Sequence, residues 1–407
     1  MCRAVRADAA GAGVEVSACS ARDPDDALMA AIKELRCVIG GCSYAADEIA
    51  YTCPRHGESG TLDILYDYDD LRAELDRDRL TAAGPSDCWR YKALLPLSAE
   101  SRVPPLAVGW TPLYDAPRIA ASVGLDRVWV KDDGANPTGS LKDRASALVL
   151  ARALEAGIEI VSTASTGNAA AALAGLGASL PEIDTVIFVP ATAPAAKVAQ
   201  LLVYGANVLL VDGSYDDAFE LCLAVCAEQG WYSRNTGVNP FTTEGKKTVA
   251  LEIAEQLGWN APDVVVASVG DGSIISGVHK GFSDLTRLGW IERMPRLIGV
   301  QAEGSAALAN AFDAGLAPGE IVRQKAETIA DSIASELPRD RAKALRAVRS
   351  SGGAFVKASD AAISAAIPKF AQLSGVFAEP AAAAAFAGLE RAVRAGLNSA
   401  DATGCEI

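Results

Sequence analysis

The chain has 407 residues, of which 50% are hydrophobic and 22% charged, and its 51 acidic and 37 basic side chains give a formal net charge of −14. This negative charge disfavours a nucleic acid as partner, because phosphate backbones repel an acidic surface. The hydrophobic content is too high for a disordered chain, and the length predicts a globular protein of roughly two or three domains.

The distribution of apolar residues and cysteines indicates a cytoplasmic location. The first residues lack the continuous apolar block that a secretory signal requires. The longest uncharged run, Ile160–Pro181, is rich in Ser, Thr, Gly and Asn, so we expect a strand, a loop and a helix there and not a membrane span. The nine scattered cysteines do not suggest the disulfide framework of a small secreted domain.

Changes in composition along the chain predict three regions. Residues 1–30 are small and polar and are expected to form a loose N-terminal extension. Residues 31–95 are expected to form a small N-terminal subdomain. Residues 96–407 are expected to form the main α/β core of two subdomains, the smaller of which covers about residues 150–245.

The small subdomain contains residues that could bind a metal. Cys37 and Cys42 are followed by Cys53 and His56, and thiolates and an imidazole are the ligands of tetrahedral zinc. The alternative is a pair of turns that contain reduced thiols. Because the spacing is irregular, we assign no metal ligand from the sequence.

From Arg127 onward, short β-branched runs alternate with helical patterns rich in Ala and Leu. This alternation predicts an α/β fold, with parallel strands and helices on both faces of the sheet. The predicted strands are Val128–Val130, Glu159–Ser162, Thr185–Val189, Val208–Val211, Val264–Val269, Leu297–Gln301 and Phe355–Lys357. The predicted helices are Arg144–Ala156, Ala169–Gly177, Tyr215–Gln229, Glu244–Leu257, Ser359–Gln372 and Glu379–Ala395.

Ligands of open α/β sheets bind at the carboxyl ends of the strands, and the first unusual loop there is Lys131–Arg144, which ends in the run NPTGSLKDR. Its turn residues and Ser140 predict a helix start. Lys142 would then lie in the first helical turn, where the helix dipole and partial burial lower the pKa of its amine and favour a role as nucleophile or base. The alternative is a solvated lysine paired with Asp143.

Two further loops have compositions suited to a polar ligand. In Ser162–Asn168 (STASTGN), hydroxyl groups and an amide at a helix start suit a polar ring or an anion, although an ordinary helix cap has the same composition. In Val269–Gly277 (VGDGSIISG), two glycines let backbone N–H groups approach a phosphate. Ile275 breaks the dinucleotide-binding pattern, so we do not expect a dinucleotide.

These loops together resemble those of the threonine synthases, which are fold-type II enzymes that depend on pyridoxal 5'-phosphate. Lys131–Arg144 is similar to their Schiff-base lysine motif, Ser165–Asn168 to the loop that binds the cofactor ring, and Gly270–Ile274 to the phosphate loop. Tyr232–Thr248 is similar to their substrate-side segment. The resemblance implies two α/β domains with mostly parallel sheets flanked by helices.

The resemblance also implies roles for individual residues. Lys142 would bind the cofactor covalently and shuttle protons, and Asn168 would hydrogen-bond its phenolic oxygen. The cofactor phosphate would be held by Gly270, Asp271, Gly272, Ser273 and Ile274. The candidates for binding the substrate's own phosphate are Lys131, Arg234, Asn239 and Lys246.

As a function, the resemblance implies a cytoplasmic carbon–oxygen lyase of threonine biosynthesis. It would convert O-phospho-L-homoserine and water to L-threonine and inorganic phosphate. The expected partner is this small-molecule substrate, with no nucleic acid and no membrane, and a homodimer is one possible assembly. One alternative is a fold-type II lyase that dehydrates threonine or serine. The other is a non-catalytic relative with a shortened C-terminus, because no strand pattern precedes Thr403 where relatives have a further strand.

Overall fold

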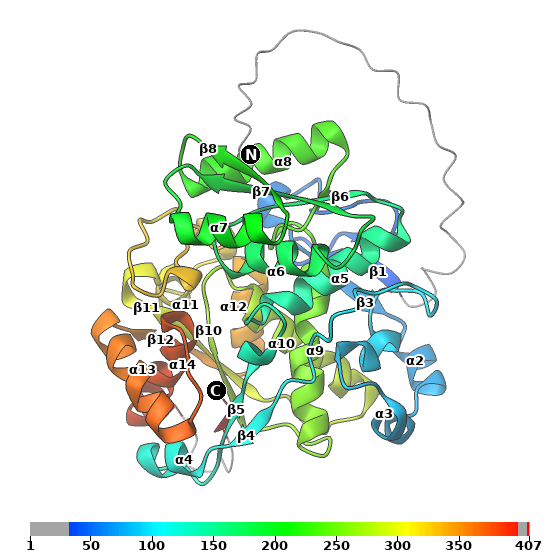
Figure 1. The fold of residues 1–407 in the computed structure, drawn as a ribbon. Helices are drawn as coiled ribbons and strands as arrows, with labels where there is room; N and C mark the ends of the chain where they lie inside the picture. Colours follow the sequence, from blue (N-terminus) through cyan, green and yellow to red (C-terminus); the bar gives the residue numbers. More distant parts are fainter. Residues whose placement is uncertain (1–31, 398–404, 407) are drawn as a thin grey trace, which may run out of the picture.

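The computed structural model describes residues 32–397 and 405–406. The predicted N-terminal extension and Thr403 lie outside the described residues. Within them the chain forms three sheets, each with its own helices (Figure 1). None of the described helices is long and apolar enough to cross a membrane.

The first sheet is small and antiparallel and lies near the N-terminus. Its strand order is β2-β1-β3. In β3 the alternation of buried Leu62, Ile64 and Tyr66 with less buried residues turns one face toward the core. Its elements, with the two helices that follow, are β1 (Ile32–Cys37), β2 (Ser43–Tyr44), β3 (Leu62–Tyr66), α2 (Tyr68–Glu74) and α3 (Arg77–Ala83).

The second sheet is parallel, with the order β8-β7-β6-β9. Its central strand β7 is buried on both faces, because Val186 and Phe188 pack against α8 while Ile187 and Val189 pack against α6 and α7. Its elements are β6 (Ile160–Ala164), α6 (Asn168–Gly177), β7 (Asp184–Pro190), α7 (Ala195–Val203), β8 (Asn207–Val211), α8 (Tyr215–Gln229) and β9 (Tyr232–Ser233).

The third sheet has the order β12-β11-β10-β13-β5-β4, and its neighbours are parallel except for β4 and β5. Two-residue β13 pairs with the first residues of β10 and β5. The strands are β4 (Leu113–Asp115), β5 (Val128–Lys131), β10 (Val264–Ser268), β11 (Arg296–Ala302), β12 (Ala354–Ala358) and β13 (Cys405–Glu406).

Helices cover both faces of the third sheet. The core on one face joins the sheet to α4, α13 and α14, with Val300 and Phe386 among its buried residues. On the other face α9 lies between α5 and α10, which are its main neighbours. The helices are α4 (Pro117–Val123), α5 (Lys142–Glu155), α9 (Phe241–Gln256), α10 (Ser273–Leu288), α11 (Ala307–Asp313), α12 (Arg341–Ser350), α13 (Asp360–Ser374) and α14 (Pro380–Arg394).

The seven strands and six helices predicted from Arg127 onward are all present, with ends that differ by a few residues. The strands that were not predicted are short or lie outside the alternating region. For example, β9 and β13 have two residues each, which is too few to produce a periodic pattern. The predicted α/β architecture is therefore confirmed.

Close packing of α5 on α9 requires a glycine at position 245. A Cβ atom there would overlap the backbone carbonyl of Arg144 on α5. Because this neighbour is backbone, it cannot move aside as a side chain can. The contact therefore fixes the start of α5, where Lys142 lies, against α9.

We predict that Gly245→Ala destabilises the protein by about 1–3 kcal/mol, the usual cost of overpacking, although alanine favours a helix more than glycine does. Urea unfolding measures the change. Gly319→Ala is the control, because Gly319 has no heavy atom near its Cβ position, and its effect should stay within about 0.5 kcal/mol. A Gly245→Ala protein as stable as the wild type would contradict the packing argument.

Candidate active site

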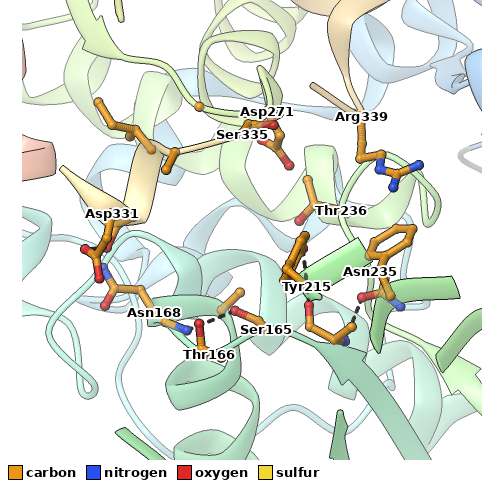
Figure 2. A pocket seen from close by; sticks show the side chains of 18 of the residues that line it. Ser165, Thr166, Asn168, Tyr215, Asn235, Thr236, Asp271, Asp331, Ser335 and Arg339 are labelled. Carbon is orange, nitrogen blue, oxygen red and sulfur yellow. Dashed lines mark hydrogen bonds between the residues drawn. The ribbon is translucent and has the colours of Figure 1, made fainter. Parts of the chain in front are cut away.

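A cavity of about 390 Å³ lies among the loops that follow β6, β9 and β10. Its volume falls in the range of about 300–1,000 Å³ typical of small-molecule sites. Figure 2 shows Ser165, Thr166 and Asn168 on one side of the cavity, with Asp271 and Arg339 across from them. Lys142, Asn168 and the loop that begins at Gly270 all line this cavity.

Lys142 is the first residue of α5, and its side chain faces the cavity. Its backbone N–H donates to the hydroxyl of Ser140 at 3.3 Å, although Leu141 and not Ser140 occupies the N-cap position. Asp143 does not pair with Lys142. Instead its carboxylate accepts hydrogen bonds from the backbone N–H (2.7 Å) and the hydroxyl of Thr138, which closes the turn.

Burial lowers the pKa of the Lys142 amine, and the negative charge of Glu379 partly opposes this effect. A lysine with a lowered pKa has a larger neutral fraction near neutral pH, and only the neutral amine is a nucleophile or a base. The position and the pKa of Lys142 therefore suit the reactive role that its motif predicts.

Arg144 anchors the start of α5 in the core. It bridges Asp133, at 2.7 Å, and Glu252 of α9, and the side chains of Arg144 and Glu252 are fully buried. Lys131 belongs to the same network, because its Nζ lies 2.7 Å from Glu252 and also donates to the backbone oxygen of Thr111. Lys131 was predicted to bind substrate, but it does not line the cavity, and its amine is engaged in this core network.

Asn239 also has a local structural role. Its Nδ2 donates to the backbone oxygen of Ser233 at 2.8 Å, and its Oδ1 accepts from the N–H of Phe241 at the start of α9 at 2.9 Å. Its side chain is buried and is not part of the cavity wall. Asn239 was predicted to bind substrate, but the structure places it outside the cavity, where both ends of its amide connect β9 to α9.

Arg234 and Lys246 do line the cavity, and each is buried, with 1% and 2% of its surface exposed. Arg234 donates to the hydroxyls of Ser146 and Thr236, both at 3.0 Å, and Lys246 donates to the hydroxyls of Ser273 and Thr236. Within residues 32–397 and 405–406, neither forms a salt bridge with a carboxylate, and neither does Lys142.

Burial lowers the pKa of Lys246 to about 7 and that of Arg234 to about 10, with Asp271 as the main opposing charge. Buried cations that lack an ion-pair partner are costly. A cavity that is lined by three such cations is suited to anions. Their arrangement indicates a ligand with phosphate or carboxylate groups.

The Gly270–Ile274 segment leads from β10 into α10, and Gly270, Asp271, Gly272 and Ile274 line the cavity at the N-terminus of that 16-residue helix. Ser273, also predicted to hold the phosphate, does not line the cavity, and its hydroxyl accepts from Lys246. Gly272 has φ +98°, and a Cβ atom there would lie 2.7 Å from the Cβ of Ala344, so only glycine fits. The carboxylate of Asp271 accepts from the N–H of Ser273 at 3.1 Å. The remaining N–H groups and the helix dipole suit a phosphate.

The hydroxyl of Ser268 supports a polar ligand in this cavity. Ser268 ends β10 and lines the cavity, and its buried Oγ has no hydrogen-bond partner among the described residues. A buried hydroxyl without a partner is unfavourable unless a ligand or water provides one. Together with Lys142 and the Gly270–Ile274 loop, it makes a donor set that fits pyridoxal phosphate.

Asn168 begins α6, and its Nδ2 donates to the carboxylate of Glu379 at 2.9 Å. This contact brings the loop after β6 close to the start of α14, and the charge of Glu379 also reaches Lys142. The role of Glu379 was not predicted. The sequence Glu379-Pro380 indicated a helix start only.

Arg339 is another residue that the sequence did not indicate. It lines the cavity, and its guanidinium donates to Asp216 of α8 at 2.8 Å and to Glu58 at 3.1 Å. No motif surrounds it, and its partners lie far away in the chain. Only the folded structure connects this arginine to the candidate site.

Comparisons with known proteins agree with this description. Residues 105–405 match a protein family that is described as "Pyridoxal-phosphate dependent enzyme". The threonine synthase of Methanosarcina acetivorans is 40% identical over 91% of this chain and 89% of its own length. The threonine synthase of Methanocaldococcus jannaschii is 37% identical over 90% and 89%.

Among solved structures, threonine deaminase isoform 2 from Solanum lycopersicum superposes with a TM-score of 0.64 and 22% identity, covering 82% of this chain and 84% of that one. At this identity the likeness concerns the fold alone. It confirms the predicted fold-type II architecture.

The lowered pKa of Lys246 predicts a pH-dependent stability. Between about 7 and the value near 10.4 of an exposed lysine, the unfolded chain binds more protons than the folded chain. The free energy of unfolding of the ligand-free protein should therefore rise with pH in this window, by at most about 1.4 kcal/mol per pH unit.

Urea unfolding across this window measures the effect, with Lys246→Met as the comparison. The variant should lose this part of the slope. Equal slopes for the wild type and the variant would contradict the assignment of an unpaired buried lysine.

Proposed function

The chain belongs to the pyridoxal-phosphate-dependent enzymes and, within them, to the threonine synthases, and on this premise we propose that it converts O-phospho-L-homoserine and water to L-threonine and inorganic phosphate. The observation that carries the proposal is the cavity in which Lys142, Arg234 and Lys246 lie without a carboxylate partner among the described residues. The reaction brings two phosphate groups into one site, that of the cofactor and that of the substrate.

The residues that would hold the cofactor are Lys142, Asn168 and the Gly270–Ile274 loop. Lys142 offers an amine of lowered pKa for the covalent bond, and the start of α10 offers N–H groups for the phosphate. Pyridoxal phosphate, when bound, supplies an electron sink for the negative charge that develops on the substrate carbons.

The chain itself supplies proton transfer and orientation. With its lowered pKa, the Lys142 amine is suited to accept the protons of substrate Cα and Cβ and to return protons at Cγ and Cα, while water supplies the hydroxyl at Cβ. The hydrogen bond from Asn168 to Glu379 keeps that amide at the cavity wall. The proton transfers therefore depend on one amine that is held beside the cofactor site.

Arg234 and Lys246 favour a phosphorylated substrate over the alternative of threonine or serine dehydration. Both side chains are basic and buried, and they donate to hydroxyl groups and, from Arg234, to the backbone oxygen of Lys142. A hydroxy-amino acid has a single carboxylate, whereas O-phosphohomoserine adds a phosphate that can compensate further positive charge. We therefore propose that these two side chains, and not Lys131 or Asn239, which lie outside the cavity wall, bind the substrate phosphate beside the cofactor.

A cytoplasmic location is part of this proposal. The six cysteines whose side chains the structure describes are free thiols, and a reducing compartment preserves thiols in that state.

The assay for this proposal is the release of inorganic phosphate from O-phosphohomoserine by the holoenzyme, with threonine identified as the second product. Lys142→Ala should abolish turnover and the covalent bond to the cofactor, which borohydride trapping and mass spectrometry detect. Lys369→Ala is the control, because Lys369 pairs with Glu390 at the surface of α13 and should leave both readouts unchanged. Ammonia release from threonine without phosphate release from O-phosphohomoserine would identify a dehydratase instead.

We further predict that Arg234→Met lowers kcat/KM for O-phosphohomoserine about 10- to 100-fold, the loss expected when a charge-assisted hydrogen bond worth about 1.5–3 kcal/mol is removed. The cofactor should still bind, which its absorption spectrum monitors. An unchanged kcat/KM with full cofactor occupancy would exclude Arg234 from substrate binding.

A further inference from the structure

The small N-terminal sheet carries a group of potential metal ligands outside the cavity. Cys37 ends β1, and Cys53 and His56 lie in the turn before β3. One ligand atom of each of the three lies within 4.8 Å of the others. Cys37 and Cys53 are 1% and 0% exposed, so both thiols are shielded from solvent.

The distances in this cluster match a metal site. The Nδ1 atom of His56 lies 3.5 Å from the sulfur of Cys37 and 3.3 Å from that of Cys53. Zinc bonds of about 2.3 Å to sulfur and about 2.0 Å to nitrogen place the ligands of a tetrahedral ion roughly 3.5 Å apart. One imidazole nitrogen offers a single proton or a single lone pair, whereas a cation between the three atoms satisfies all of them.

The backbone holds both ends of the cluster in tight turns. The N–H of Cys37 donates to the oxygen of Cys42 at 2.8 Å, and the N–H groups of His56 and Gly57 donate to the oxygen of Cys53 at 3.1 and 2.9 Å. Gly40 packs directly on the imidazole, because a Cβ atom there would overlap the ring of His56. The ligand geometry is therefore set by the fold and does not depend on flexible side chains alone.

Two more side chains complete the surroundings. The hydroxyl of Tyr44 lies 3.0 Å from the sulfur of Cys53, in the position of an outer group that hydrogen-bonds a metal-bound thiolate. Cys42 lies directly across the turn from Cys37, with its sulfur 4.0 Å from the oxygen of Gly40. Cys42 is not one of the three clustered residues, but its place in this turn makes its thiol the candidate for a fourth ligand.

We propose that Cys37, Cys42, Cys53 and His56 bind a structural Zn²⁺ ion. Four protein ligands leave no open position for a substrate or a reactive water, so this ion has a structural role. The bound ion stabilises the loop from Cys53 to β3.

This loop contacts the wall of the active-site cavity. Glu58 lies 3.1 Å from Arg339, which lines the cavity, and the hydroxyl of Ser59 accepts from Arg341 at 2.6 Å. Metal binding at such a site contributes directly to the free energy of folding. The zinc ion thereby holds in place a segment that positions Arg339.

The test is the metal content of the holoenzyme purified without chelator, measured by inductively coupled plasma mass spectrometry. We expect one zinc ion per chain. Cys53→Ser and His56→Ala should lose the zinc, whereas Cys88→Ala, which removes a buried free thiol outside the cluster, should retain it. A zinc-free wild type, or zinc retained in both ligand variants, would overturn the proposal.

Because a ligand variant could fail to fold, a second measurement uses the wild-type chain. Holoenzyme produced with cobalt in place of zinc should show the absorption of tetrahedral cobalt together with cobalt–thiolate bands. Cys42→Ser should weaken the thiolate bands and keep the tetrahedral bands. Octahedral cobalt without thiolate bands would overturn the site, and unchanged thiolate bands in Cys42→Ser would overturn the four-ligand assignment.

Discussion

The interaction on which this structure depends is the burial of three cationic side chains around one cavity without a carboxylate partner among the described residues. Lys142, Arg234 and Lys246 would each be more stable beside a carboxylate, because a buried charge without a partner loses its hydration and gains little in return. Their positive charge is compensated when anions enter the cavity. Binding of a phosphorylated cofactor and a phosphorylated substrate follows from this electrostatic arrangement.

Two carboxylates near the start of α5 are engaged by other partners and do not pair with the three cations. Glu252 pairs with Arg144 and Lys131, and Asp143 closes its own turn through Thr138. The close contact of α5 with α9 then directs Lys142 toward the cavity. The ion pairs of Arg144 with Asp133 and Glu252 therefore anchor in the core the same turn that carries Lys142, so stability and the position of Lys142 are coupled at the start of α5.

Much of the fold and part of the site could be predicted, because parallel strands and their loops leave local signals. The turn residues around Lys142 and the glycines at positions 270 and 272 follow predicted strands, so the sequence indicated both as ligand-binding loops. The sequence could not show that Arg234 lines the cavity and Lys131 does not, because both are single cations near strand ends. Lys131 is held away from the cavity by its ion pair with Glu252, which lies far away in the chain. Arg339 lacked any motif, and the convergence of Cys37, Cys53 and His56 depends on the pairing of β1 with β3.

The most direct measurement of the central claim is a crystal structure of the holoenzyme with inorganic phosphate, the product of the proposed reaction. The account predicts the cofactor bonded to Lys142, its phosphate at the start of α10, and a second phosphate within hydrogen-bond distance of Arg234 and Lys246. A structure in which these two side chains pair with carboxylates of the protein, and in which phosphate is absent beside the cofactor, would contradict it.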